Sequence, residues 1–169
     1  MEIRNSREED LQKILEIYES ARAFMAANGN PNQWGRTHWP PKSLILEDIR
    51  TGHGYVVTEG EKIGAAFAFF AGKDIDPSYR KIEMGSWLLD TPYGVIHRIA
   101  SPGTVKGVGK FCVNWAVERS GGHLRVDTHG DNVVVQNMLR GLGFAHCGTI
   151  YVEEDDYPRL AFEKSNNCR

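Results

Sequence analysis

The sequence predicts a mixed α/β fold, built as a single domain over residues 1–169. Apolar residues recur at helical spacing in several segments, and stretches rich in β-branched and aromatic residues lie between them. The chain has 169 residues, of which 41% are hydrophobic, and this is long enough to bury one core without disulfides or a metal. We find no repeat, low-complexity segment or linker, so nothing divides the chain into further domains.

The first predicted elements are two helices joined by a loop. Residues 5–25 carry an apolar stripe at helical spacing, and Ser6 with Glu9 predicts a capping box at its start. The stretch 28–41, NGNPNQWGRTHWPP, combines turn residues with two tryptophans and therefore predicts an aromatic loop. A short helix is predicted from Ser43 to Arg50.

A run of strands is predicted next. Residues 55–58 and 63–72 are rich in β-branched and aromatic residues, and the turn residues EGEK between them predict a hairpin. Residues 79–89 and 93–100 are predicted as two further strands joined by the sequence DTP.

Strands and helices alternate in the remainder of the chain. An apolar stripe predicts a helix beginning at residue 108, and residues 123–129 predict a strand. A second amphipathic helix is expected over 131–143, opened by an Asp-Asn pair and closed by a glycine. Residues 144–152 and 159–164 then form a final pair of strands around the sequence EEDDYP.

Composition excludes several functional classes. The formal net charge of −2 gives no general attraction to nucleic acid or to an anionic membrane, and no apolar run is long enough to cross a bilayer. Cys112, Cys147 and Cys168 are odd in number and form no CxxC pair, which argues against a disulfide framework or a metal site. We therefore expect a cytoplasmic protein without a bound metal.

Three glycines crowd the segment between the strand at 93–100 and the following helix. Gly103, Gly107 and Gly109 each cost backbone entropy on folding, so their grouping needs a reason. A P-loop is excluded because Thr104 stands where its first glycine is required. A dinucleotide fingerprint is excluded because Cys112 stands in place of its third glycine.

The remaining pattern is a strand, a glycine turn and a helix N-terminus. Such a terminus presents unpaired N–H groups, which suit a phosphate or pyrophosphate, and Lys106 and Lys110 add positive charge. The alternative is a tight strand-to-helix connection with solvated lysines. The loop by itself favours neither interpretation.

Two segments considered together favour the phosphate-binding interpretation of the loop. The sequences HRIAS…KGVGK at 97–110 and RVDTHGDN…LGF at 125–144 resemble the GNAT superfamily of acetyl-CoA-dependent N-acetyltransferases. The resemblance covers nearly the whole chain, including an opening strand-helix order. It implies a mixed, mostly antiparallel central sheet flanked by helices, the GNAT-like acyl-CoA N-acyltransferase fold.

The resemblance also implies how acetyl-CoA would bind. In this family the strand before the glycine loop splays from its neighbour, and the pantetheine arm of CoA fills the gap between them. One backbone amide there also polarises the thioester carbonyl. The positions in this chain that match the family's cofactor-binding residues are Ile99, Ala100, Ser101, Val105, Lys106, Gly107, Val108, Gly109, Lys110 and Asn132. For the asparagine, a plain helix N-cap is an equally weighted alternative.

Two departures from the family pattern concern the loop and the chemistry. Thr104 replaces the usual Arg or Gln before the first loop glycine, and the loop is shorter, although binding through backbone amides survives both changes. Leu139 stands where the family often has the tyrosine that protonates the CoA thiolate. Tyr151, His129 or water would take that role, or the thiolate would leave unaided because the pKa of a thiol is modest.

The amine acceptor must lose a proton before or during its attack on the thioester. Glu83 and His97 are the leading candidates for the catalytic base, and Asp127 and His129 are second choices. Glu83 can instead be a solvated partner of Lys81, the histidines can be hydrogen-bonded structural residues, and a water chain can replace them all. No Ser-His-Asp or Cys-His grouping is evident, so direct transfer without a covalent enzyme intermediate is favoured.

The acceptor pocket is expected among aromatic residues. In this family the first helices and the loop between them cover the acceptor side, so Gln33, Trp34, Trp87 and Tyr93 are the candidate substrate-binding residues. Tryptophans in such a loop also commonly seal the edge of a core, which is the alternative for at least half of them.

The sequence thus predicts an N-acetyltransferase that moves an acetyl group from acetyl-CoA to a primary amine on a small molecule or peptide and releases CoA. The competing interpretation is a non-catalytic acyl-CoA-binding sensor, which Leu139 favours. The expected partners are acetyl-CoA and the amine, with no nucleic acid or membrane. A homodimer is one assembly that the sequence leaves open.

Overall fold

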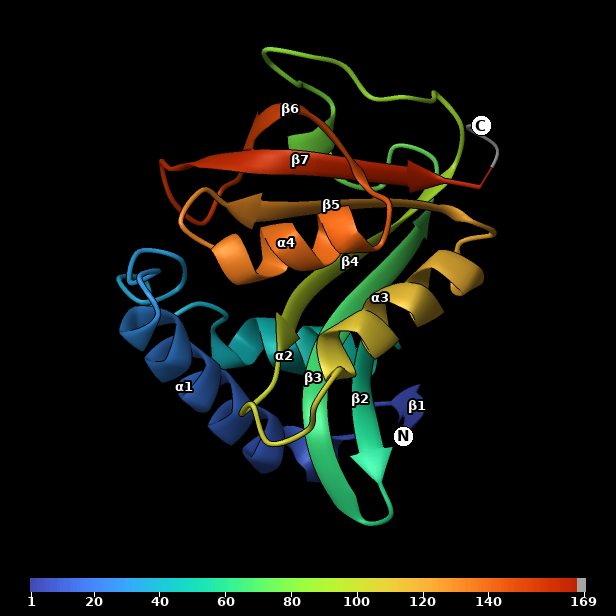
Figure 1. Cartoon of the computed structure of the whole chain (residues 1–169). Coiled ribbons are helices and arrows are strands. Elements are labelled where there is room, and N and C mark those ends of the chain that lie inside the picture. Colours follow the sequence, from blue (N-terminus) through green and yellow to red (C-terminus); the bar gives the residue numbers. More distant parts are fainter. Residues whose placement is uncertain (167–169) are drawn as a thin grey trace. The chain divides into compact units, whose positions relative to one another are not determined.

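A computed structural model describes residues 1–166 and confirms the mixed α/β fold (Figure 1). Its strands are β1 (Glu2–Asn5), β2 (Gly54–Glu59), β3 (Lys62–Gly72), β4 (Tyr93–Ala100), β5 (His123–His129), β6 (Ala145–Tyr151) and β7 (Pro158–Ser165). Its α-helices are α1 (Leu11–Ala27), α2 (Lys42–Arg50), α3 (Val108–Arg119) and α4 (Val133–Gly141). The strand order is β1-β2-β3-β4-β5-β7-β6, and the sheet is mostly antiparallel, with β4 and β5 paired in parallel.

The chain forms two compact units. The N-terminal unit contains Met1–Phe69 and His97–Val113, and the C-terminal unit contains Phe70–Ile96 and the residues from Asn114 onward. The divisions fall within β3, within β4 and within α3. Each unit has its own buried core and is described separately below.

The N-terminal unit is built on three antiparallel strands. β2 and β3 form the predicted hairpin, and β1 pairs with β2 along its whole length. The opening strand β1 agrees with the resemblance, although a lone Ile3 among polar residues gives it no clear pattern. Helix α1 buries the predicted apolar stripe, in which Ile14 and Tyr18 are 2% and 3% exposed. Burial of such a side chain contributes about 1.5–3 kcal/mol.

The predicted capping box at the first helix is wrong by one residue. The backbone N–H of Arg7 donates to the carboxylate of Asp10 at 2.8 Å, so Asp10 takes the role expected of Glu9. The chain enters α1 through a 3-10 turn over Glu8–Asp10. The hydroxyl of Ser6 is buried and has no hydrogen-bond partner among the described residues. Because residues 8, 9 and 10 are all acidic, the sequence does not distinguish between them.

The C-terminal unit contains the antiparallel strands β5, β7 and β6, as predicted for the end of the chain. Helix α4 packs against these strands, with Leu139 fully buried and the guanidinium of Arg140 lying 5.7 Å from the ring of Phe162. Lys164 on β7 donates to the carbonyl of Leu142 at the end of α4. These contacts fix the helix on its strands.

The strand predicted over residues 79–89 is wrong. A 3-10 turn occupies Pro77–Tyr79, and a single bridge joins Glu83 to Thr149 on β6. The rest of the segment is irregular. A Cβ atom on Gly85 would lie 1.9 Å from the carbonyl oxygen of Cys147, so a glycine is required where this segment crosses β6. Hydrogen bonds to the side chains of Arg125 on β5 and Glu163 on β7 take the place of the strand pairing that was predicted here.

Two features bear on the expected class of protein. None of the helices within residues 1–166 combines the length and apolar character needed to span a bilayer. Within the same range, no three His, Cys, Asp or Glu side chains gather in a way that could hold a metal ion. Cys112 and Cys147 are free thiols in buried positions, and burial raises the pKa of Cys112 to about 12. Cys168 lies outside the described residues.

Candidate active site

The end of β4 in the N-terminal unit carries the residues predicted to bind the acetyl group. Ile99, Ala100 and Ser101 follow Arg98, whose φ of 57° lies in the left-handed region that non-glycine residues rarely adopt. The guanidinium of Arg98 contacts both oxygens of Asp48, at 2.9 and 2.8 Å. An unusual backbone conformation therefore stands directly before the predicted acetyl-binding amides.

The charge of Asp48 is costly in this position. Burial raises the pKa of the Asp48 carboxyl, and the nearby charges of Arg98 and His97 oppose that shift. His97, a candidate base, is half-buried on β4 and lies near enough to Asp48 to influence it. Asp48 and Arg98 were not predicted as site residues, because an acid in a helix and a basic residue in a strand carry no signal by themselves.

The glycine loop turns from β4 into α3 through two left-handed residues. Gly103 has a φ of 78° and Gly107 a φ of 77°, so backbone conformation accounts for two of the three glycines. In the first hydrogen bond of the helix, the backbone N–H of Phe111 donates to the carbonyl of Gly107 at 3.0 Å. Consequently the N–H groups of residues 108–110 have no acceptor within the helix, which is the arrangement that binds phosphate.

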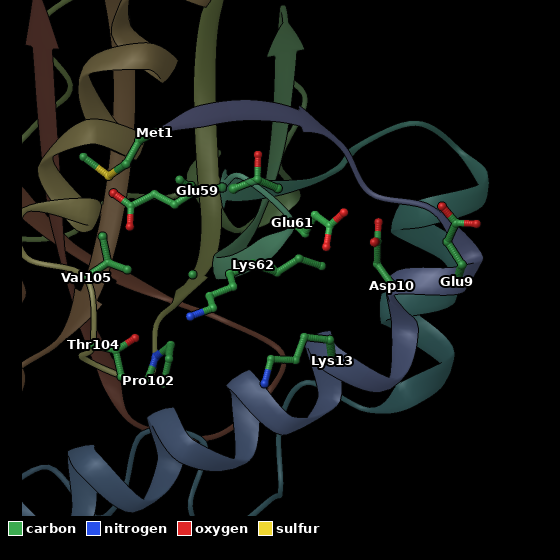
Figure 2. A pocket seen from close by; sticks show the side chains of 14 residues that line it. Met1, Glu9, Asp10, Lys13, Glu59, Glu61, Lys62, Pro102, Thr104 and Val105 are labelled. Atoms are coloured by element: carbon green, nitrogen blue, oxygen red, sulfur yellow. The ribbon is translucent and has the colours of Figure 1, made fainter.

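The loop is held against the hairpin by Val105. A Cβ atom on Gly64 of β3 would lie 2.9 Å from a methyl group of Val105, so Gly64 leaves room for that side chain. A cavity of about 800 Å³ lies on this side of the loop, bordered by Pro102, Thr104, the hairpin and the start of α1 (Figure 2). Its charged lining mixes two lysines with four carboxylates. Because the carboxylates outnumber the lysines, this cavity does not favour an anion.

Gln33 and Trp34 of the predicted acceptor loop are buried in the same unit. Trp34 is 8% exposed and packs edge-on against Tyr18 at 5.8 Å, inside the core. Gln33 accepts a hydrogen bond from Asn30 at 2.8 Å. The structure thus shows Trp34 sealing the core, which was the alternative interpretation of the loop tryptophans. Acceptor binding by Gln33 and Trp34 stays a prediction.

Glu83, the other leading base candidate, lies in the C-terminal unit. Its carboxylate is 2.7 Å from the ammonium of Lys81, and its side chain is 39% exposed. This is the solvated pair that the sequence analysis considered as its alternative. Glu83 is also fixed by backbone, because it exchanges two hydrogen bonds of 2.8 Å with Thr149.

Trp87 and Tyr93, predicted to line the acceptor pocket, both face a cation supplied by the chain. The guanidinium of Arg125 lies 4.3 Å from the ring of Trp87 and 4.0 Å from that of Tyr93. All three side chains border a cavity of about 720 Å³ in the C-terminal unit. Because Arg125 occupies these ring faces, the pair is poorly suited to a cationic acceptor.

A buried carboxylate balances Arg125. Glu163 on β7 is fully buried and accepts from Arg125 Nε at 3.1 Å and from the backbone N–H of Leu88. Arg125 also donates to the carbonyl of Leu89 at 2.5 Å. These bonds hold the irregular segment that replaces the predicted strand. Sequence analysis missed Arg125 and Glu163 because their pairing across β5 and β7 depends on register.

His129, at the end of β5, is held neutral by its surroundings. Its side chain is buried, and both burial, the larger cause, and the charge of Arg159 lower the pKa of its imidazole. Nδ1 accepts the N–H of Asp131 at 3.0 Å, which places the proton on Nε2. Nε2 has no hydrogen-bond partner among the described residues. In this tautomer His129 suits donation of a hydrogen bond better than acceptance of a proton.

Asp127, a second-choice base, is also engaged. It accepts a hydrogen bond from the hydroxyl of Tyr79 at 2.7 Å, and Arg159 lies 4.0 Å away. Burial raises the pKa of Tyr79 well above its ordinary value, and the charge of Asp127 adds to that effect. This carboxylate is therefore part of a structural network.

Asn132 serves as the N-cap of α4. Its side-chain oxygen accepts the N–H of Val135 at 3.2 Å, as the N-cap alternative requires. Contact of Asn132 with CoA stays a prediction. Leu139 is completely buried, so it lies in the core at the position where the resemblance implies a tyrosine.

The chain was compared with known proteins. No protein-family model and no curated protein sequence matches it. Among solved structures, a GNAT-family acetyltransferase from Streptococcus agalactiae shares 30% sequence identity and a TM-score of 0.86, over 98% of this chain and 95% of that one. The chain belongs to the GNAT family.

Other structures support the GNAT fold at lower identity. A GNAT-family acetyltransferase from Listeria monocytogenes has 17% identity and a TM-score of 0.70, over 97% of this chain and 94% of that one. A ribosomal-protein-alanine N-acetyltransferase from Brucella melitensis has 18% identity and a TM-score of 0.56, over 98% and 99% of the two chains. The GNAT fold implied by the sequence resemblance is thus confirmed.

Proposed function

We propose that this GNAT protein transfers an acetyl group from acetyl-CoA directly to a primary amine. The observation that carries the proposal is the continuous segment in the N-terminal unit from Arg98 to Lys110. It joins a strained strand end to a glycine turn and to three helix N–H groups without helical acceptors. Membership of a family of acetyltransferases supports the same reaction and disfavours the sensor interpretation.

The loop residues fit the two ends of the cofactor. The N–H groups of residues 108–110, with Lys106 and Lys110, would hold the pyrophosphate. The backbone of Ile99, Ala100 and Ser101 would hold the pantetheine arm and the acetyl carbonyl, and Asn132 would contact the arm. Acetyl-CoA, when bound, supplies an activated acetyl group and a thiol leaving group.

Different groups of the chain would then assist different parts of the transfer reaction. A backbone N–H among residues 99–101 stabilises the negative charge that develops on the acetyl oxygen. Glu83 or His97, directly or through water, accepts the amine proton as the new C–N bond forms and the C–S bond breaks. His129 is positioned as a hydrogen-bond donor by its tautomer, which makes it a candidate to stabilise the departing thiolate. Gln33, Trp34, Trp87 and Tyr93 are proposed for the acceptor side.

Release of free thiol tests this function. The protein is incubated with acetyl-CoA and a panel of small amines and peptides, and CoA is followed with a thiol reagent. Acceptor-dependent CoA release and an acetylated amine in the mass spectrum are the expected results. Binding of acetyl-CoA with no acceptor-dependent thiol across the panel would overturn the proposal in favour of a sensor.

A further inference from the structure

Arg98 holds a backbone conformation that its side chain disfavours. A non-glycine residue rarely adopts the left-handed region, because its Cβ crowds the backbone there, and Arg98 adopts a φ of 57° within a strand. Such strain persists only where surrounding contacts maintain it. The structure shows which contacts do so.

Two buried groups from different helices hold Arg98. The hydroxyl of Tyr18 on α1 donates to the backbone carbonyl of Arg98 at 2.8 Å, and Tyr18 is only 3% exposed. Asp48 on α2 accepts from the guanidinium, and both side chains are about one-tenth exposed. The first contact fixes the peptide plane after Arg98, and the second fixes the direction of its side chain.

The ion pair is poorly arranged for stability alone. A single nitrogen, Nη2 of Arg98, contacts both oxygens of Asp48, whereas the strongest pairs use two parallel bonds. The Nε atom of Arg98 is buried without a partner among the described residues. Buried pairs of this kind are often no more stable than apolar replacements. A role in fixing one conformation accounts better for the pair.

We propose that Tyr18 and Asp48 are positioning residues that hold Arg98 in its left-handed conformation and so aim the N–H groups of residues 99–101 at the acetyl carbonyl. The inference rests on the proposed function, because it assigns the catalytic contact to those amides. The direction of these N–H groups then depends on two side chains, on α1 and α2, that need not touch either substrate.

The test compares turnover with ground-state binding in Asp48→Asn and Tyr18→Phe. Asp48→Asn keeps the shape of the side chain and removes its charge, and Tyr18→Phe removes one hydroxyl. Misdirected amides act mainly in the transition state, so kcat should fall about 10-fold or more while KM for acetyl-CoA stays within about threefold. Tyr18→Phe removes a single oxygen and serves as the test if Asp48→Asn does not fold.

A glycine substitution at position 98 distinguishes a positioning role of these contacts from an effect on stability alone. Glycine adopts a positive φ without strain, whereas alanine does not. In the Asp48→Asn background, Arg98→Gly should restore most of the lost kcat, and Arg98→Ala should not. These two double variants lose the same ion pair and differ at residue 98 by one methyl group.

A second arginine–aspartate pair provides the control. Arg4 and Asp10 form two parallel bonds of 2.7 and 2.9 Å in the same unit, and Asp10→Asn should lower the melting temperature without changing kcat. Asp48→Asn and Tyr18→Phe variants that behave like this control would overturn the inference and leave the proposed function intact. Equal kcat in the two double variants would also overturn it. If the parent protein acetylates no amine in the panel, the proposed function fails and the inference fails with it.

Discussion

The Nε2 atom of His123 lies 2.5 Å from Oε1 of Glu163, and both side chains are buried. Glu163 also accepts from Arg125 and from the backbone of Leu88. One carboxylate thus joins β5 and β7 to the irregular segment before β4. In the C-terminal unit this network takes the place of a strand pairing.

Glu163→Gln should destabilise the protein strongly. The substitution leaves the guanidinium of Arg125 buried without its counter-ion, a change that typically costs about 3–5 kcal/mol. The free energy of unfolding, measured by urea denaturation, should fall by an amount in this range. Asp74→Asn, which breaks the exposed Asp74–Arg80 pair in the same unit, is the control and should leave the midpoint nearly unchanged. Equal effects of the two substitutions would contradict the assigned role of Glu163.

The same network explains why residues 79–89 misled the sequence analysis. Ile82, Trp87 and Leu88 give the segment the composition of a strand, but the backbone N–H of Leu88 donates to the carboxylate of Glu163, which is remote in the sequence. Trp87 Nε1 donates to the carbonyl of Tyr79 at 2.8 Å. Local composition predicts a preference for extended backbone, and it does not reveal a competing partner more than 70 residues away.

The N-terminal unit was easier to predict in its elements than in its site. The hairpin and α2 follow from apolar spacing and turn residues, which are local signals. The left-handed Arg98 and its partner Asp48 are 50 residues apart, and no spacing rule links them. Trp34 was predicted correctly to lie in a loop, but its burial against Tyr18 depends on how that loop folds back onto α1.

Stability should decrease as the pH falls below the ordinary pKa of histidine, about 6.5, partly through His129. Burial lowers the pKa of His129, so in this window the unfolded chain takes up a proton that the folded protein does not. The contribution of His129 is complete above that pH and is lost as the pH falls toward the lowered value. His129→Gln should reduce the change in urea midpoint between pH 7.5 and 5.5.

His38→Asn is the matched control for this pH effect, because His38 is exposed. It should leave the pH dependence of the urea midpoint as in the parent. A His129→Gln protein whose midpoint changes with pH as steeply as the parent's would show that the buried imidazole is not responsible.

Gly107→Val should weaken CoA binding by about 10-fold or more, equivalent to about 1.4 kcal/mol. A Cβ atom at Gly107 meets nothing within 4 Å, so a new side chain would project into the space where we propose the pyrophosphate lies. Gly103→Val is a close control, because Gly103 has nearly the same φ and equally open surroundings. Isothermal titration with CoA should show weak binding for the first variant and binding within threefold of the parent for the second. Similar losses of CoA affinity in the two variants would indicate that backbone strain, and not a block at the pyrophosphate, weakens binding.

Lys106→Ala should weaken CoA binding modestly, by roughly threefold in low salt, because an exposed lysine acts through screened charge. The difference from the parent should shrink in 0.5 M salt, about the condition in which the Debye length falls below 5 Å. Lys42→Ala, an exposed lysine at the start of α2, should match the parent at both salt concentrations. A loss that persists in high salt would indicate a direct, desolvated contact.

The catalytic base can be identified from the pH dependence of turnover in Glu83→Gln and His97→Asn. Removal of a true general base typically lowers the rate by about 10²–10⁴-fold and removes the rise of kcat/KM with pH that the base controls. We expect this result for one of the two variants, with the other retaining the parent's profile.

Lys81→Ala distinguishes the two roles of Glu83, because it removes the salt bridge and keeps the carboxylate. If Glu83→Gln is impaired and Lys81→Ala is not, the carboxylate acts in the chemistry and not through its ion pair. Unchanged profiles in both base variants would contradict both assignments and indicate that water takes the proton.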